Sequence, residues 1–475
     1  MLEKTLGSLI RDRGREGRRG FTLPKHDVER TELEEVLPQK FVRKEKPKLP
    51  EVDEPTAIRH YTNLSRKNWG IDTNFYPLGS CTMKHNPRAN EAAAAVPGFA
   101  GLHPLQTEKE AQGALRVMYE LQGFLSEISG LPAVSLQPMA GAQGELTSIL
   151  MVKKYFEDAG DDVRTTVLVP ATAHGTNPAT ASMADFKSVE VGLDEHGCVD
   201  VDELREKVDE TTAALMITNP NTCGVYERNI AEIAEVLHEA GAFLYMDGAN
   251  MNANLGRMRP ADASVDIMHF NLHKTFSTPH GGGGPGCGAI ACSETLAPFR
   301  PDPVVEKHGD AHRFFRPDKS IGRMSTFHGN FGVVLKAWNY IQMHGPELRD
   351  VTDMAVLNAN YVRARLKSAY RVPYEGPCKH EVVVQPPKGM KALDIAKGLI
   401  DHGYHPPTIY FPLVVKEAML IEPTETESKE TLDDFVGAML ELAETALDEL
   451  EAAPLHAPTR RLDEARAARQ LKARW

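Results

Sequence analysis

The sequence predicts an α/β fold, in which a large domain is built on a mainly parallel sheet and a smaller α+β domain follows it. Two observations predict this class. Short apolar runs of strand length recur between residues 130 and 292, and most are bounded by Pro, Gly, Asn or Asp. Segments with helical periodicity fill several of the gaps between these runs. Alternating strands and helices are typical of βαβ units, whose ligands bind beyond the carboxyl ends of the strands.

The chain is expected to begin with an extended arm over residues 1–60. The first fifty residues are punctuated by Pro, lack a sustained apolar period and carry 13 Lys or Arg against 9 Asp or Glu. Such an arm usually lies on another surface, often that of a partner subunit. A loosely ordered tail is the alternative.

The large domain is predicted over residues 61–345. One of its helices has Ile230, Ile233 and Leu237 on a single apolar face, and Gly241 follows as a typical C-cap. The strands are expected at 134–137, 165–169, 188–191, 213–217, 242–246, 266–270 and 287–292.

A smaller α+β domain is predicted over residues 346–475. Its elements are helices at 353–367 and 391–401, apolar runs at 381–384 and 411–415, and a long amphipathic helix from Leu432 to Leu450. The tail from Thr459 is basic and rich in Ala and Arg. We expect it to be an exposed, solvated helix.

Composition excludes several classes of protein. With 41% hydrophobic and 25% charged residues in 475, the chain is globular and long enough for two or three domains. A net charge of −12 argues against nucleic-acid binding. The sequence has no apolar stretch typical of a membrane span or signal peptide, and its six scattered cysteines form no CxxC pair. We therefore expect a cytoplasmic protein with no metal site.

The central candidate for chemistry is Lys274, which follows a predicted strand and precedes the glycine run 281–284. A lysine in this setting can bind phosphate as a point charge or form a Schiff base with a carbonyl cofactor. The Walker pattern requires Gly-Lys-Ser/Thr after the loop, whereas this loop ends in Pro-Gly-Cys at 285–287. A P-loop is therefore excluded.

Asp247 ends a neighbouring predicted strand, and the two positions match the needs of pyridoxal 5′-phosphate (PLP). In PLP enzymes a lysine holds the aldehyde as an imine, and an aspartate pairs with the pyridinium nitrogen and preserves the electron sink. A helix N-cap is the structural alternative for Asp247.

Three further segments follow predicted strands. The small residues of 140–145 open a helix, whose free N–H groups can hold the cofactor phosphate. His174 can stack on the pyridine ring, and Asn221 can donate to its phenolic oxygen. Each signal is modest alone, but their order and placement are jointly specific.

This order of parts resembles the fold type I PLP enzymes. It resembles more closely the P-proteins of the glycine cleavage system, which are PLP-dependent glycine decarboxylases. In some bacteria and archaea these consist of two chains, and this sequence is similar to the second, lysine-bearing one. The matching segments are 18–24 (RRGFTLP), 74–84 (NFYPLGSCTMK), 141–145, 174–179, 218–224, 247–250, 271–287 and 325–330 (STFHGN).

The resemblance implies that Lys274 forms an internal aldimine and that glycine replaces it in an external aldimine and loses CO2. The aminomethyl group then passes to the lipoyl arm of H-protein. Asp247 would keep the ring nitrogen protonated, while His174 would stack on the ring and relay protons. The implied cofactor contacts are Gly141, Ala142, Gln143, His174, Asn221, Thr222, Asp247, Ala249, His273, Lys274 and Thr326, the last, with Ser325, across a subunit boundary.

The resemblance also implies a homologous, lysine-lacking partner chain, two pairs of chains in a heterotetramer, and lipoylated H-protein as a second partner. The alternatives are another fold type I enzyme, such as an amino-acid decarboxylase or cysteine desulfurase, and a non-catalytic structural subunit. A desulfurase needs a mobile cysteine, whereas Cys81 lies in a Pro/Gly turn. Lys274 and Asp247 argue against a structural subunit.

Overall fold

The computed structural model describes residues 9–45, 47–280, 286–457 and 459–471. It divides the chain into two units, Met1–Thr73 and Asn74–Trp475. The predicted glycine run 281–284 lies outside the described residues. No helix in the described ranges is long and apolar enough to cross a membrane.

The first unit has short elements and almost no interior. Its main helix is α3 (Glu54–Ser65), which Asp53 caps by accepting the Thr56 N–H at 2.8 Å. The shorter turns are η1 (Ile10–Arg13), α2 (Leu33–Val36) and η2 (Gln39–Phe41). Among its described residues only His60 is buried, so the unit has no apolar core of its own.

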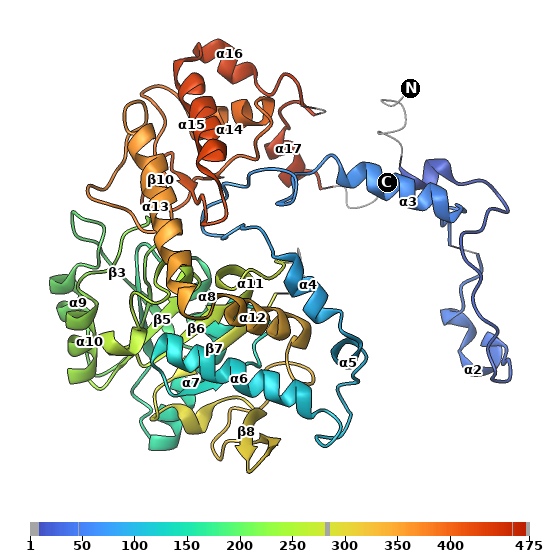
Figure 1. Cartoon of the computed structure of the whole chain (residues 1–475), viewed down its shortest axis with the longest axis horizontal. Helices are drawn as coiled ribbons and strands as arrows, with labels where there is room; N and C mark the ends of the chain where they lie inside the picture. The colour runs from blue at the N-terminus through green and yellow to red at the C-terminus, as the bar shows by residue number, and fades with distance from the viewer. Residues whose placement is uncertain (1–8, 46, 281–285, 458, 472–475) are drawn as a thin grey trace. The chain divides into compact units, whose positions relative to one another are not determined.

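The second unit is built on a seven-stranded sheet in the order β1-β7-β6-β5-β4-β2-β3 (Figure 1). Strands β2 to β6 pair in parallel, whereas β7 is antiparallel to both of its neighbours. The bounds are β1 Ala133–Ser135, β2 Thr166–Pro170, β3 Lys187–Val191, β4 Thr212–Thr218, β5 Phe243–Gly248, β6 Ile267–Asn271 and β7 Gly288–Cys292. The α/β class and the predicted strands are confirmed.

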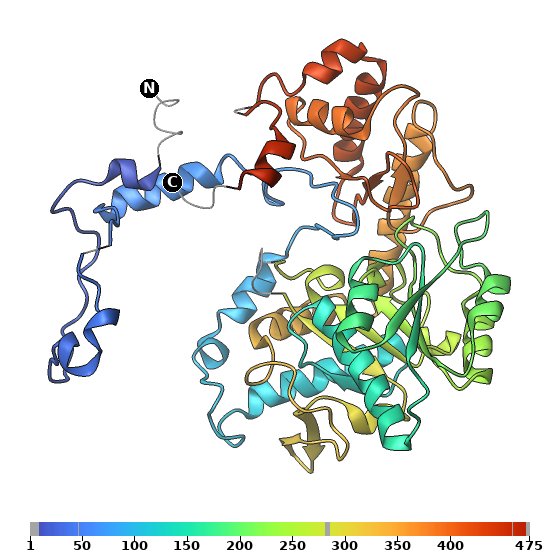
Figure 2. The ribbon, with the colours of Figure 1, turned by 180° about the vertical axis from the view of Figure 1, so that it is seen from behind.

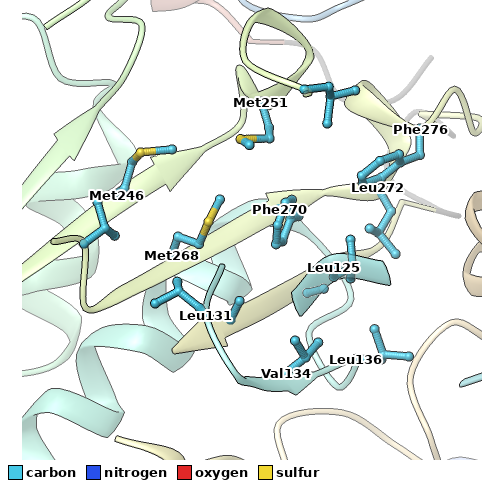
Figure 3. Packing of buried hydrophobic residues seen from close by; sticks show 14 of the residues in the cluster. Leu125, Leu131, Val134, Leu136, Met246, Met251, Met268, Phe270, Leu272 and Phe276 are labelled. Carbon is cyan, nitrogen blue, oxygen red and sulfur yellow. The ribbon is translucent and has the colours of Figure 1, made fainter. Parts of the chain in front are cut away.

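Helices cover both faces of this sheet, as its continuously apolar strands require. One face packs on α6 (Gln112–Ser129), α10 (Ile230–Glu239) and α12 (Phe331–His344), the other on α7 (Gly141–Ala159) and α8 (Thr176–Met183). Figure 3 shows Met246, Met268 and Phe270 of the first face in one apolar cluster with Leu125 of α6. The remaining elements of this region are α4 Arg88–Ala94, α5 Pro97–Ala100, α9 Val201–Lys207, η3 Met251–Ala253, η4 Pro260–Ala263, α11 Leu272–Thr275, η5 Ala297–Phe299, β8 Val304–His308 and β9 Ala311–Phe315.

A small three-stranded sheet, β10-β12-β11, organises the C-terminal region, which is drawn in orange and red in Figures 1 and 2. Its strands are β10 Val382–Val384, β11 Thr408–Ile409 and β12 Met419–Ile421. Its helices are α13 Leu348–Leu366, α14 Ala392–Asp401, α15 Lys429–Glu444, α16 Leu447–Ala452 and the exposed α17 Glu464–Arg469, with η6 Gly345–Glu347 before α13.

Two details of this region differ from the sequence-based expectation. The apolar run at 411–415 forms bends and turns, and the central strand is β12 instead. The helix expected to reach Leu450 ends at Glu444, because Thr445 and Ala446 are extended, and a separate α16 follows.

Candidate active site

Lys274 lies on α11, directly after β6 and at the carboxyl edge of the sheet. Leu272 and Phe276 on either side of it insert into the core shown in Figure 3. The Lys274 Nζ donates to the Ser80 carbonyl at 2.8 Å. The lysine is therefore anchored through its neighbours, while its amine faces a cavity.

This cavity has a volume of about 220 Å³ and gathers most of the residues predicted for the site. Strand ends supply many of its walls, as expected for a parallel sheet. It is lined by Ser80, Ala140, Gly141, Ala142, Glu145, His174, Thr176, Thr218, Thr222, Asp247, Ala249, Asn250, Asn271, His273 and Lys274. Gln143, Asn221 and Thr326 do not line it.

The N-terminus of α7 opens onto the cavity at Gly141 and Ala142. A side chain at Gly141 would not fit, because its Cβ would lie 1.9 Å from Asn271 Oδ1. Gln143 instead accepts the Met139 N–H at 2.7 Å and donates to the Met324 carbonyl at 2.6 Å. Free amides at the start of a 19-residue helix fit a phosphate group, with Gln143 fixing the loop beside them.

Asp247 is the next-to-last residue of β5 and is almost fully buried. Its Oδ1 accepts the Ala249 N–H at 2.9 Å, and its Oδ2 lies 3.4 Å from Asn177 Nδ2. Behind it, His269 Nε2 is 3.5 Å from Oδ1, and the Tyr245 hydroxyl lies 2.6 Å from His269 Nδ1. Burial lowers the pKa of His269, so a neutral ring supports the carboxylate from behind.

Glu145 lies beside Asp247 and is a further functional candidate. The sequence places it in the predicted phosphate-binding segment 140–145 but indicates no role for its carboxyl group. It accepts from the Thr176 hydroxyl and from Asn177 Nδ2, both at 2.8 Å. Burial, and then the charge of Asp247, raise the pKa of Glu145 to about 7. A carboxyl poised near neutrality in a cavity is typical of functional sites. Only its burial in the structure reveals this property.

The two predicted histidines, His174 and His273, both line the cavity. His174 packs edge-on against Phe411, with ring centroids 5.7 Å apart, and its Nδ1 lies 3.0 Å from Thr176 Oγ1. Burial lowers the pKa of His174. His273 Nδ1 contacts the Cys287 backbone, and burial lowers the pKa of His273 to about 4.

Asn221 and Thr222 follow β4, but only Thr222 reaches the cavity. The Asn221 amide donates to the Gly197 carbonyl at 2.7 Å, and its oxygen accepts the Cys223 N–H at 2.9 Å. Its side chain is thus used within the turn. Thr222 donates to the Thr172 carbonyl at 2.7 Å, while Ser325 donates to Gln137 at 3.2 Å. The role of Ser325 and Thr326 across a subunit boundary stays a prediction.

Cys81 lies in the turn that receives Lys274. Burial is the main cause that raises the pKa of the Cys81 thiol, with Glu422 and Glu381 adding to it. The thiol is therefore neutral, and hydrogen bonds from Ser80 and Thr82 to two glutamates fix the turn that carries it. Both properties are unfavourable for a mobile cysteine nucleophile.

Two family models match the chain. Residues 144–301 match the aminotransferase class-V family, and residues 351–465 match the C-terminal domain of glycine dehydrogenase. The first match contains Glu145, Asp247 and Lys274, and the second covers most of the small domain.

Two relatives that match over nearly their whole length carry the same name. A probable glycine dehydrogenase (decarboxylating) subunit 2 of Halalkalibacterium halodurans is 54% identical over 98% of this chain and 97% of its own length. One from Alkaliphilus oremlandii is 50% identical over 100% and 99%.

Solved structures share the fold at lower identity. A glycine decarboxylase (P-protein) of the glycine cleavage system superposes with a TM-score of 0.74 at 22% identity, covering 86% of this chain and 95% of that one. A cysteine desulfurase from Escherichia coli gives 0.60 at 16% identity, covering 78% and 96%. These likenesses confirm the fold type I architecture.

Proposed function

Because this chain belongs to the family of glycine dehydrogenase (decarboxylating) subunit 2 of the glycine cleavage system, we propose that it decarboxylates glycine with the help of PLP. The aminomethyl group would then pass to the lipoyl arm of H-protein. The observation that carries the proposal is the convergence of Lys274, Asp247 and the N-terminus of α7 on one cavity.

The residues of the cavity fit PLP in kind. Lys274 would hold the aldehyde carbon, Asp247 would face the ring nitrogen, and the amides at Gly141 and Ala142 would hold the phosphate. Bound there, PLP supplies an electron sink for the pair left on the glycine carbon when CO2 departs. The chain's own task is to orient the reacting bond and to keep the ring nitrogen protonated.

Proton handling falls to His174 and Glu145. His174 lines the cavity with a solvent-exposed imidazole that can accept a proton and return it. Glu145 shares Asn177 with Asp247, so its protonation adjusts the charge that Asp247 presents to the ring. Glycine has no side chain, so the substrate needs only a carboxylate contact and room for two hydrogens.

The partner chain is part of the proposal. Relatives are named subunit 2, and the first unit of this chain exposes large apolar side chains, among them Phe21 (77%), Leu23 (80%) and Phe41 (68%). Exposed apolar patches of this kind are typical of protein interfaces. We infer that this arm lies on a homologous, lysine-lacking subunit 1, in an assembly of two such pairs.

An exchange assay tests the function. The purified pair of chains, supplied with PLP and lipoylated H-protein, should exchange labelled bicarbonate into the carboxyl group of glycine. Omission of H-protein should reduce the exchange sharply. Sulfur release from cysteine without glycine exchange would favour the desulfurase alternative, and absence of both activities would favour a structural subunit.

A further inference from the structure

Two glutamates that flank strands of the small sheet contact the turn whose Ser80 carbonyl accepts a hydrogen bond from Lys274. Glu381 directly precedes β10, and Glu422 directly follows β12. Because Val382 pairs with Ile421 in an antiparallel register, Glu381 and Glu422 occupy facing positions. Both side chains are completely buried. Two facing buried carboxylates repel each other strongly, so this pair needs an explanation.

Both glutamates bind the backbone of residues 79–82, here called the lysine-receiving turn. Glu381 Oε2 accepts the Ser80 N–H, and Glu422 Oε2 accepts the Thr82 N–H, both at 2.8 Å. Ser80 and Thr82 have φ angles of 66° and 42°, in the left-handed region that non-glycine residues avoid. The Ser80 carbonyl in turn accepts from Lys274 Nζ. The carboxyls thus hold a strained turn in the form that meets the lysine.

The remaining polar atoms of the pair are not equivalent. Glu422 Oε1 lies 3.4 Å from Asn252 Nδ2, whereas Glu381 Oε1 has no hydrogen-bond partner among the described residues. Within the same described part of the chain neither ring nitrogen of the buried His380 has a partner, and its Nε2 lies 3.8 Å from Glu381 Oε1 and 3.9 Å from Glu422 Oε1. The contact with Asn252 therefore distinguishes the two carboxyls, and the distance to His380 does not. A charged oxygen without a donor is costly in such a place. If Glu381 Oε1 carries a proton, it can donate a hydrogen bond to His380 Nε2 after a small movement. Both atoms then have a partner, and Glu381 is uncharged.

We propose that Glu381 is a neutral carboxylic acid and Glu422 the single carboxylate of this pair, and that both are positioning residues for Lys274. Glu422 then supplies one buried negative charge to the lysine ammonium, and Glu381 holds the Ser80 amide without adding a second charge. Only the choice of PLP as the molecule that Lys274 binds rests on the proposed function. The protonation of Glu381 does not depend on it.

The surrounding charges agree with this assignment. Burial, and then the charge of Glu422, raise the pKa of Glu381 well above its usual range. Burial raises the pKa of Glu422 as well, but Thr82 and the charge of Lys274 oppose that rise. Burial lowers the pKa of His380 to about 3, and the Lys274 and Lys379 charges act in the same direction, so its ring is a neutral acceptor. The ionisable groups that act on the pair and on His380 are Lys274, Lys379 and Glu425, and Cys81 faces both carboxyls.

Infrared spectroscopy of the cofactor-free, full-length chain tests the proton directly. At about pH 9, well above the usual carboxyl range, the spectrum should contain the carbonyl stretch of a carboxylic acid, and Glu381→Gln should remove it. Glu227→Gln is the matched control, because Glu227 is also buried and accepts a backbone N–H, that of Val199, at 2.7 Å. An unchanged spectrum in Glu381→Gln, or one equivalent of metal bound at this cluster, would overturn the assignment.

Cofactor capture tests the positioning role. PLP is added to each variant, trapped on lysine with borohydride and located by peptide mass spectrometry. Glu381→Gln should stay within about threefold of wild type. Glu422→Gln removes the negative charge that favours the unreactive ammonium form of Lys274, so the pH at which its capture rate is half-maximal should fall by about one unit or more relative to wild type. Glu422→Asp, which keeps the charge, should return this pH profile toward that of wild type and serves if Glu422→Gln does not fold.

The outcomes separate the two proposals. A pH profile of capture in Glu422→Gln that matches wild type would refute the positioning role and leave the proposed function intact. If wild type itself captures no PLP on Lys274, the proposed function fails, while the infrared result still decides the protonation of Glu381.

Discussion

At the level of single residues, Lys274 is the side chain whose chemistry no neighbour can replace. Lys84 is also buried, and it donates to the carbonyl of Thr275, the residue after Lys274. Its amine is already paired with Glu425 at 2.7 Å. Lys274→Ala should therefore abolish glycine–bicarbonate exchange and borohydride trapping of PLP. The exposed Lys187, changed to Ala, is the control that should leave both unchanged. Substantial exchange in Lys274→Ala would refute the assignment.

Asp247→Asn separates cofactor binding from turnover. Asparagine can still accept the Ala249 N–H, so the loop after β5 and PLP binding should survive. It carries no charge to keep the ring nitrogen protonated, so the exchange rate should fall by far more than threefold. A rate within about threefold of wild type, worth roughly 0.7 kcal/mol, would contradict the role. Asp200→Asn, which alters a capping aspartate on α9, is a suitable control.

Glu145 predicts a pH dependence of stability. Its pKa in the folded chain is raised to about 7 by burial and the Asp247 charge, so the folded state binds an extra proton between the two pKa values. The free energy of unfolding should therefore fall as pH rises from about 4.5 to about 7.

The substitution Glu145→Gln removes this penalty, which is on the order of 1–3 kcal/mol above the folded pKa. Thermal melts should show the variant gaining stability relative to wild type between about pH 5 and pH 8. A difference in melting temperature that does not change with pH would contradict the prediction.

At the level of elements, residues 84–90, which lead into α4, hold the end of α11 and the residues that follow it. Lys84 donates to the Thr275 carbonyl at 2.8 Å, Asn90 Nδ2 to the Ser277 carbonyl at 3.3 Å, and the Ser277 hydroxyl to the His85 carbonyl at 2.8 Å. These contacts connect residues almost two hundred positions apart. The motif at 74–84 therefore supports Lys274. The sequence of this motif does not reveal that role.

Breaking this support should be costly. Burial would lower the pKa of Lys84, but Glu425 and Tyr340 outweigh it and the pKa rises, so the pair is charged. Lys84→Met leaves the Glu425 carboxylate buried and unpaired, and should cost about 3–5 kcal/mol in urea unfolding. Lys84→Met combined with Glu425→Leu should recover most of the loss. Arg205→Ala, in an exposed pair with Glu232, should cost about 1 kcal/mol or less.

Sequence patterns predicted the parts of this fold that follow from local rules. The strand runs and the residues at their carboxyl ends are set by apolar periodicity and by the geometry of parallel sheets. The sequence could therefore predict that Lys274, Asp247 and His174 share one edge of the sheet, and all three line one cavity. The buried glutamates Glu381 and Glu422 could not be predicted in this way. They contact a turn that lies 300 or more residues earlier in the chain, and no local pattern connects the two. Asn221 shows the converse limit, since its position after β4 was recognised but not the turn that uses its amide.

At the level of the whole molecule, the two units differ in how they can be stable. Among its described residues the second unit has four apolar clusters, whereas the first unit exposes its apolar side chains. A segment with so little buried surface cannot offset its own conformational entropy. The order of the first unit must therefore come from a surface outside it, which we infer to be subunit 1.

This inference gives the last prediction, which concerns assembly. Expressed alone, the chain should be poorly soluble or show little exchange with H-protein, because its arm leaves apolar surface uncovered. Co-expression with subunit 1 should restore both properties. Serine at Phe21, Leu23 and Phe41 together should improve the solubility of the lone chain and abolish its co-purification with subunit 1.

The matched control is Val163→Ser, which removes an apolar side chain that is 52% exposed in the second unit. It should leave co-purification unchanged, because a single exposed apolar residue needs no partner to cover it. The second unit keeps its clusters in the triple variant, so PLP trapping on Lys274 should persist even where assembly is lost. A well-behaved, fully active homodimer of this chain alone would refute the partnership, since the arm would then find its covering surface on a second copy of the same chain.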